Sequence, residues 1–173
     1  HDLLGGLELP TLLVTHDFED AAALADRIGV LAAGEIRQLG SAAELLGAPR
    51  DPFVASFTGA NVLRGVAKPD SSGLTQVLLD GGAQLVMTDA ASGPVAVALY
   101  PWEIDLARQA GKGSTANHLS LPVSSVVTVG NRARVRCGPL TAEISRASLD
   151  RLALAAGEIV VASFKATAVR RVG

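Results

Sequence analysis

His16 stands where an imidazole could act on a phosphate. It follows the apolar run at residues 11–15, and Asp17 comes directly after it, with Glu19 and Asp20 close behind. An apolar run of this kind after a proline predicts a buried parallel strand, and ligands of open α/β sheets lie at the carboxyl ends of strands. An imidazole there can hydrogen-bond a phosphate or orient a water molecule. A satisfied structural histidine is the simpler alternative for a lone histidine.

The residues after His16 predict the elements that would hold it in place. Asp17 is a suitable helix N-cap, and apolar residues at helical spacing follow it. Ser41 and Glu44 have the spacing of a capping box, and Pro52 stands where a proline can begin a helix. Beyond the first helix, we predict strands at 27–32 and 35–39 and short helices at 41–47 and 52–57.

The character of the chain changes near residues 59–61, where we predict a domain boundary. Helical periodicity stops there, and short β-rich runs separated by Gly, Pro, Ser and Asp follow. Residues 1–58 have three basic and nine acidic side chains, whereas residues 131–173 have eight basic and three acidic ones. An acidic start and a basic end indicate two units with different partners.

Two stretches of the β-rich half are similar to each other. Residues 61–66 resemble residues 117–123, and residues 93–100 resemble residues 157–164. The offsets are 56 and 64, so one loop differs in length between the copies. The pattern predicts two small β-barrel-like modules in tandem. Coincidence in a chain rich in Ala, Val and Gly is the alternative.

Residues 12–36 resemble the switch-histidine segment of ABC transporter ATPases and the strand–turn–strand that follows it in that family. The similarity continues to residue 57, at the end of the ATPase domain. The resemblance implies that His16 contacts the γ-phosphate of ATP and that Asp17 supports the neighbouring loop across the dimer. The full-length parent would use ATP and Mg²⁺.

The phosphate-binding loop of that family does not occur in this sequence. Its motif needs a Ser or Thr directly after the lysine, but Gly113 follows Lys112 here and no predicted strand leads into the segment. We therefore expect the loop to lie upstream of His1, in a longer chain of which this is the C-terminal part. For the same reason we expect no ATP hydrolysis by this chain alone and no bound cofactor.

The β-rich half resembles the C-terminal regulatory TOBE domain of importer ATPases, which in molybdate importers looks like a pair of molbindin (Mop) modules. One Mop module is matched in three places. Its opening motif resembles residues 113–117, its central strand and turn resemble residues 140–148, and its closing segment resembles residues 154–169. The first copy is less similar. Tyr100 stands where TOBE domains have the arginine of an Arg-Pro-Glu stretch, and no counterpart of Lys165 is found there.

The resemblance implies an oxyanion site in the second copy. Hydroxyl and backbone N–H groups would supply donors from several directions, and Lys165 would add charge. Each charge-assisted hydrogen bond contributes roughly 1.5–3 kcal/mol, whereas micromolar binding needs about −8.2 kcal/mol, so several donors must converge. Ala116 stands where the motif has an arginine, which removes one charged donor. The expected ligand residues are Ser114, Asn117, Ser145, Lys165 and Ala166, the last through its backbone N–H.

Simpler interpretations exist for these and other polar residues. Ser114 and Asn117 can be turn residues, and Lys165 can be a solvated strand lysine. Alternating arginines at 132–136 share one face of a predicted strand, which is typical of a solvated surface. Cys137 is the only cysteine, so no internal disulfide can form, and we expect it to act as a small apolar residue.

We predict a mainly β chain: tandem OB-like or Mop-like β-barrel modules (TOBE), preceded by an α/β remnant of the ABC ATPase domain. Residues 1–58 would end the nucleotide-binding domain. Residues 59–173 would form the regulatory domain, with repeats at about 60–108 and 113–173. The expected function is oxyanion sensing in an importer ATPase, for molybdate or tungstate before sulfate. The alternative is a ligand-free structural or dimerisation TOBE domain in a sugar, iron or polyamine importer.

The expected partners follow from this interpretation. They are a second copy of the ATPase subunit, the transmembrane permease subunits and the small oxyanion. The subunit would be cytoplasmic and would lie on the inner face of the membrane through the permease. An aromatic content of 3% and a net charge of −2 count against nucleic acid as a partner. No metal site is predicted.

Overall fold

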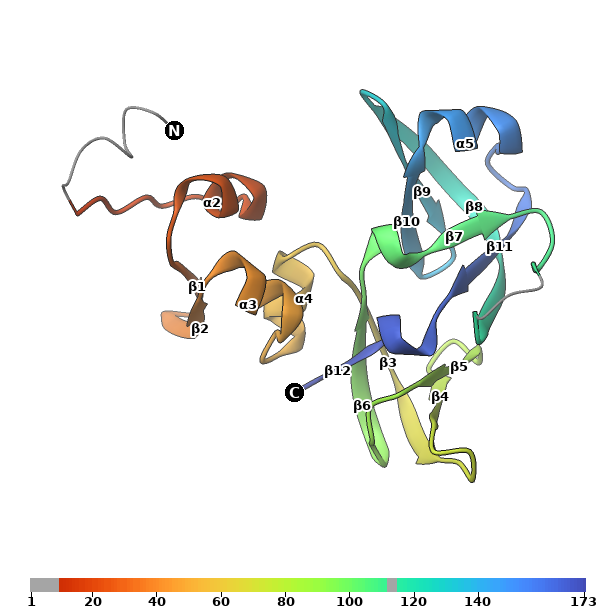
Figure 1. The fold of residues 1–173 in the computed structure, drawn as a ribbon, viewed down its shortest axis with the longest axis horizontal. Helices are drawn as coiled ribbons and strands as arrows, with labels where there is room; N and C mark the ends of the chain where they lie inside the picture. Colours follow the sequence, from red (N-terminus) through yellow and green to blue (C-terminus); the bar gives the residue numbers. More distant parts are fainter. Residues whose placement is uncertain (1–9, 112–114) are drawn as a thin grey trace. The chain divides into compact units, whose positions relative to one another are not determined.

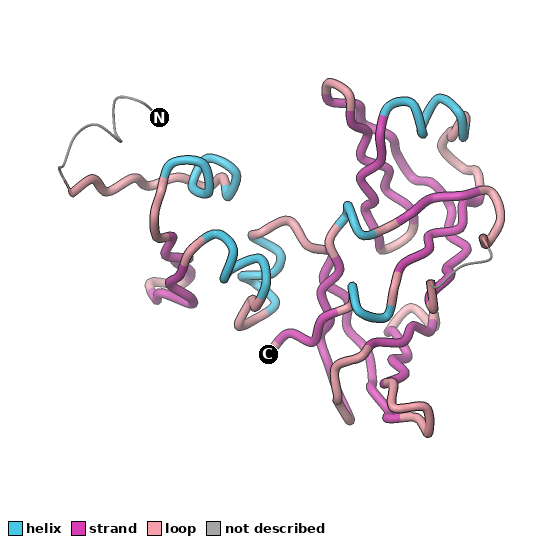
Figure 2. Tube along the Cα trace, in the orientation of Figure 1, coloured by secondary structure: helices cyan, strands magenta, loops and turns pink. Residues whose placement is uncertain are grey.

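Residues 10–111 and 115–173 are described by the computed structural model of the chain (Figure 1). The chain divides between Gly59 and Ala60 into two units. Figure 2 shows that helix and strand alternate in the first unit and that strands dominate the second. The prediction of a mainly β chain with a small α/β segment before it is confirmed.

The first unit contains every helix and hairpin that the sequence predicts after His16. In chain order these are α2 (Phe18–Leu24), β1 (Ile28–Ala32), β2 (Glu35–Gly40), α3 (Ala42–Gly47) and α4 (Pro52–Phe57). The side chains of Ala21, Ile28, Val30, Leu45 and Val54 form its core. This core is small because each helix has only six or seven residues.

Short-range hydrogen bonds fix the helix starts of this unit. A carboxylate oxygen of Asp17 accepts from the backbone N–H of Glu19 at 2.7 Å and of Asp20 at 3.1 Å. Ser41 and Glu44 form the predicted capping box. The hydrogen bonds from the Ser41 backbone and hydroxyl to the Glu44 carboxylate hold the pKa of Glu44 below its usual value.

The predicted strand at residues 11–15 is wrong. These residues are irregular, and Leu12 and Val14 are 91% and 88% exposed. A parallel strand is stable when neighbouring strands pair with it and helices cover it. In the described part of the chain, the hairpin β1–β2 is the one sheet of this unit, and its strands pair only with each other.

The second unit consists of two five-stranded antiparallel sheets. One sheet has the order β12-β6-β3-β4-β5, and the other has the order β10-β9-β8-β11-β7. Three short helices join the strands: η1 (Pro101–Glu103), α5 (Arg146–Leu152) and η2 (Ala166–Ala168). The strands are β3 (Asn61–Pro69), β4 (Thr75–Leu79), β5 (Gln84–Met87), β6 (Gly93–Leu99), β7 (Asp105–Ala107), β8 (Asn117–Val129), β9 (Arg132–Cys137), β10 (Leu140–Ser145), β11 (Ile159–Phe164) and β12 (Arg170–Val172).

The two sheets exchange their terminal strands. Strand β7 follows the first four strands of this unit but pairs with β11, and the C-terminal β12 pairs with β6 (Figure 1). The buried side chains of both halves, among them Met87, Leu99, Val135 and Phe164, belong to one hydrophobic cluster. Each sheet is therefore completed by the other half of the sequence, and the halves share one core.

The same pairing occurs in both halves, which defines their structural correspondence. Asn61 at the start of β3 lies opposite Leu99, and Asn117 at the start of β8 lies opposite Phe164. The next residues, Tyr100 and Lys165, each precede a 3-10 helix, with φ and ψ of −77° and 145° and of −76° and 151°. Tyr100 therefore corresponds to Lys165, one residue on from the alignment of the two sequence stretches.

Polar side chains on the outside of the second sheet form local ion pairs. The Glu143 carboxylate accepts from Arg132 at 2.7 Å and from Arg134 at 3.3 Å, so the alternating arginines share a face as predicted. The guanidinium of Arg108 donates to the carbonyl oxygen of Leu152 at 2.8 Å and to Glu158 at 3.0 Å. These contacts hold the exchanged strand β7 against the end of α5.

Glu158 and Cys137 are among the titratable groups of this unit that have shifted pKa values. The backbone N–H of Ala155 and the guanidinium of Arg108 hydrogen-bond the Glu158 carboxylate and lower its pKa. Cys137 is fully buried on β9, where burial raises the pKa of its thiol to about 11. The interpretation of Cys137 as an apolar core residue fits this position.

Candidate functional site

The structure places His16 and Asp17 at the start of α2, in the first unit. His16 is exposed at the bend before the helix, and the Asp17 carboxylate caps the helix. The sequence resemblance assigns His16 to the γ-phosphate of ATP and Asp17 to the support of the neighbouring loop across the dimer. Two side chains on one short segment do not surround a triphosphate, so the described residues of this unit do not by themselves fit a nucleotide.

Asn117 is buried at the start of β8 and is used for structure. Its side-chain amide nitrogen donates to the carbonyl oxygen of Val86 at 3.0 Å, and its side-chain oxygen accepts from the backbone N–H of Val86 at 2.7 Å. The amide thus imitates a residue of a neighbouring strand and links β8 to β5. Because Asn117 is only 2% exposed, these two bonds lie in a water-poor environment.

Asn61 makes the equivalent pair of bonds, from the first half of this unit to the second. Its side-chain oxygen accepts from the backbone N–H of Thr141 at 2.7 Å, and its amide nitrogen donates to the carbonyl oxygen of Thr141 at 2.9 Å. The first strand of each half is therefore joined to the third strand of the other half. We call Asn61 and Asn117 the asparagine clamps.

Lys165 and Ala166 lie beside the Asn117 clamp. Lys165 is exposed and follows Phe164, which pairs with Asn117. Within residues 10–111 and 115–173 the Lys165 ammonium has no ion-pair or hydrogen-bond partner. Ala166 begins η2, which packs against β5. The structure thus brings three of the predicted ligand residues to one end of the double sheet.

A polar row crosses three strands next to this end. The Nδ1 atom of His118 lies 2.8 Å from the hydroxyl of Ser163, and Asp105 on β7 pairs with Ser163 on its other side. Thr115 lies 3.5 Å from the other ring nitrogen of His118. Sequence reasoning missed Ser163, since nothing in an alternating β-strand pattern marks one serine as buried.

The remaining predicted ligand residues are not brought to this end. Ser145 caps α5: its hydroxyl accepts from the backbone N–H of Ser148 at 3.1 Å. It pairs with Arg132, which pairs with Val129 at the opposite end of β8 from Asn117. Ser114 lies outside the described residues.

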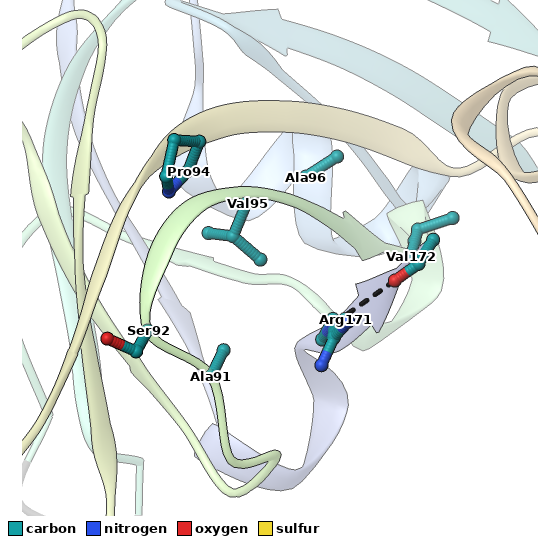
Figure 3. A pocket seen from close by; sticks show the side chains of 8 residues that line it. Ala91, Ser92, Pro94, Val95, Ala96, Arg171 and Val172 are labelled. Atoms are coloured by element: carbon teal, nitrogen blue, oxygen red, sulfur yellow. Dashed lines mark hydrogen bonds between the residues drawn. The ribbon is translucent and has the colours of Figure 1, made fainter.

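A pocket of about 240 Å³ lies between β6, β12 and the loop before β6 (Figure 3). The backbone N–H of Arg171 donates to Asp89 at 2.8 Å, and the Arg171 guanidinium donates to the carbonyl oxygen of Gly173 at 3.1 Å. No predicted ligand residue lines this pocket. Among the described residues there is no group of three or more metal-ligating side chains, and no helix is long and apolar enough to cross a membrane.

Comparison with protein families and curated proteins assigns the chain to known relatives. Residues 114–170 match the family model of the TOBE domain. The molybdate/tungstate import ATP-binding protein WtpC of Pyrococcus abyssi is 33% identical over 169 residues, which cover 95% of this chain and 47% of that protein. The sulfate/thiosulfate import ATP-binding protein CysA of Burkholderia mallei is 34% identical over 170 residues, 94% of this chain and 46% of that protein. The chain thus spans less than half of the length of these relatives.

A solved structure shows the same fold. The cytoplasmic molybdate-binding protein ModG, in a crystal form with molybdate bound, superposes with a TM-score of 0.59. The match covers 67% of this chain and 98% of that one at 21% sequence identity. At this identity the likeness establishes the fold of the β-rich unit.

Proposed function

This chain matches the C-terminal portion of the ATP-binding subunits of ABC importers and contains a TOBE domain, and from this premise we propose that its β-rich unit senses the oxyanion that the full subunit imports. Molybdate and tungstate are the favoured ligands, and sulfate is the third candidate. The names of two relatives, which divide between these anions, support the choice of chemical class.

The unpaired ammonium of Lys165 is the observation on which the proposal depends. A lysine without an acidic partner keeps its full charge available for a dianion. Lys165 also lies directly before η2, where the Ala166 N–H has no partner in the described part of the chain. Together they provide a cation and a backbone donor on adjacent residues.

The other donors have to come from the segment before Asn117. Three charge-assisted bonds of roughly 1.5–3 kcal/mol each are needed to approach the −8.2 kcal/mol of micromolar binding. Lys165 and Ala166 supply two, and the Thr115 hydroxyl, which lies 3.5 Å from Nε2 of His118, is a described candidate for a third. Asn117, whose side chain is bonded to Val86, acts in this proposal by positioning the segment rather than by contacting the anion.

In the full subunit, the anion would regulate transport. His16 would contact the γ-phosphate of ATP and Asp17 would support the neighbouring loop across the dimer. The subunit would pair with a second copy and with permease subunits at the cytoplasmic face. Feedback requires that the anion bind one state of the ATPase dimer better than the other. Residues 60–173 provide a separate unit in which such binding can occur.

Calorimetry with molybdate, tungstate and sulfate tests the proposal. We expect micromolar binding of at least one anion, and a loss of roughly tenfold or more in affinity for Lys165→Met, about the contribution of one charged bond. Lys68→Met is the matched control, because Lys68 is an exposed lysine on β3 without a described partner. No heat with any anion at roughly 100 μM protein would instead favour a ligand-free structural TOBE domain.

A further inference from the structure

The second unit presents the same backbone frame at two ends. At one end the Asn117 clamp, Phe164 and Lys165 lead into η2, which packs against β5. At the other end the Asn61 clamp, Leu99 and Tyr100 lead into η1, which packs against β10. The backbone angles of Tyr100 and Lys165 agree within 6°. If the backbone conformation alone decided binding, an anion could bind equally well at either end.

The chemistry of the two ends differs at each corresponding residue. Where one end has the unpaired ammonium of Lys165, the other has the neutral ring of Tyr100. Where one end has the N–H of Ala166, the other has Pro101, which has no N–H. The ring of Tyr100 also stacks on Trp102, with centroids 4.6 Å apart and planes 14° apart.

The surroundings of the aromatic end do not replace the missing donors. Glu103 follows Trp102 and adds an exposed carboxylate, which repels an anion. Among the described residues, the strand pairing places Arg136 opposite Thr141, beside this clamp.

We infer that the β-rich unit binds one oxyanion per chain, at the Lys165 end, and that the corresponding position at the other end has been converted to an aromatic surface by Tyr100, Pro101 and Trp102. The inference rests on the proposed function and adds the number and place of the sites. A sensor with one site per chain responds to anion concentration without cooperativity between its two halves.

The test combines stoichiometry with a natural reporter. Trp102 is the only tryptophan of the chain, so its fluorescence reports on the aromatic end. Titration of the protein with molybdate should give one anion per chain, with tryptophan emission unchanged at saturation. Arg136→Ala should keep the affinity of the wild type within about twofold, whereas Lys165→Met should lose roughly tenfold or more.

A double variant tests the reason for the asymmetry. Tyr100→Lys with Pro101→Ala restores the cation and the N–H, and should raise the stoichiometry toward two with a change in Trp102 emission. Circular dichroism confirms that each variant is folded. Two anions per wild-type chain would overturn the inference and leave the proposed function standing. Binding that is lost with Arg136→Ala and kept with Lys165→Met would overturn both, because the proposed function also depends on Lys165. No binding of any oxyanion would overturn both.

Discussion

Replacing Asn117 with alanine tests whether the asparagine clamps hold the double sheet together. The substitution removes the two bonds to Val86, of 2.7 and 3.0 Å, and leaves a backbone N–H and a carbonyl oxygen without partners. The side chain is 2% exposed, so water does not reach these groups through its position without a rearrangement. We expect a large loss of stability from a substitution that removes few atoms.

The magnitude follows from the two orphaned groups. A buried polar group that loses its partner costs about 1–3 kcal/mol. Val86 lies on the edge strand β5 and is half-buried, so the lower part of that range applies to each group. The expected loss in the free energy of unfolding is therefore about 2–4 kcal/mol, a large share of the 5–15 kcal/mol that is typical of a domain.

Urea unfolding followed by Trp102 fluorescence measures this loss, because Trp102 belongs to the second unit. With m of about 2 kcal/mol/M, the midpoint of urea unfolding should fall by roughly 1–2 M. Asn131→Ala, an exposed asparagine in the β8–β9 turn, is the matched control and should change stability by less than about 0.5 kcal/mol. A loss for Asn117→Ala no larger than that of the control would refute the clamp.

Three further predictions concern other parts of the second unit. In Gly65→Ala the new Cβ would collide with the carbonyl oxygen of Leu78, so we expect a loss of about 1–3 kcal/mol in urea unfolding, whereas Gly81→Ala, whose Cβ would meet no described atom within 4 Å, should stay near the wild type. Glu158→Gln should lower stability most above the unfolded-state pKa of about 4.3, because the lowered pKa of Glu158 stabilises the fold there. That difference should shrink as the pH falls through the folded-state pKa. A difference in urea midpoints that stays constant between pH 3 and 7 would contradict the assignment. The Cys137 thiol, buried and with its pKa raised to about 11, should react with iodoacetamide only as fast as the unit unfolds, and labelling of the native protein at the rate of a free thiol would contradict its burial.

The elements that sequence reasoning predicted best are those with short-range causes. The Asp17 cap, the Ser41 capping box and the start of α4 at Pro52 depend on residues within four positions of one another, and all three occur in the structure. The prediction of a strand at residues 11–15 is wrong because that strand depends on long-range contacts. Its apolar pattern is satisfied only by neighbouring strands, and a pattern within one segment does not show whether those strands exist.

The candidate site was predictable in its residue types but not in their roles. Asn117 was expected to be a ligand or a turn residue, whereas its partner is the backbone of Val86, 31 residues away. An apolar residue gives no sequence signal that its N–H and carbonyl oxygen are needed by a distant side chain. The repeat did contain a usable signal, since it aligned Asn61 with Asn117. Two clamps, the buried Asn117 and the partly buried Asn61, explain that correspondence without any ligand.

The exchanged strands lead to a consequence that separate tandem barrels would not have. Because β12 completes the sheet of the first half and β7 completes that of the second, neither half can lose its terminal strand without opening the other. The shared core and the clamps join the halves further, so we expect one cooperative unfolding transition for residues 60–173. An anion bound only at Lys165 should then stabilise the whole unit by about 2.7 kcal/mol at one hundred times its Kd. Trp102, whose emission we expect to stay unchanged on anion binding, should report that shift in its unfolding curve. Two transitions, with the anion shifting only the one that tryptophan does not follow, would show that the halves unfold independently.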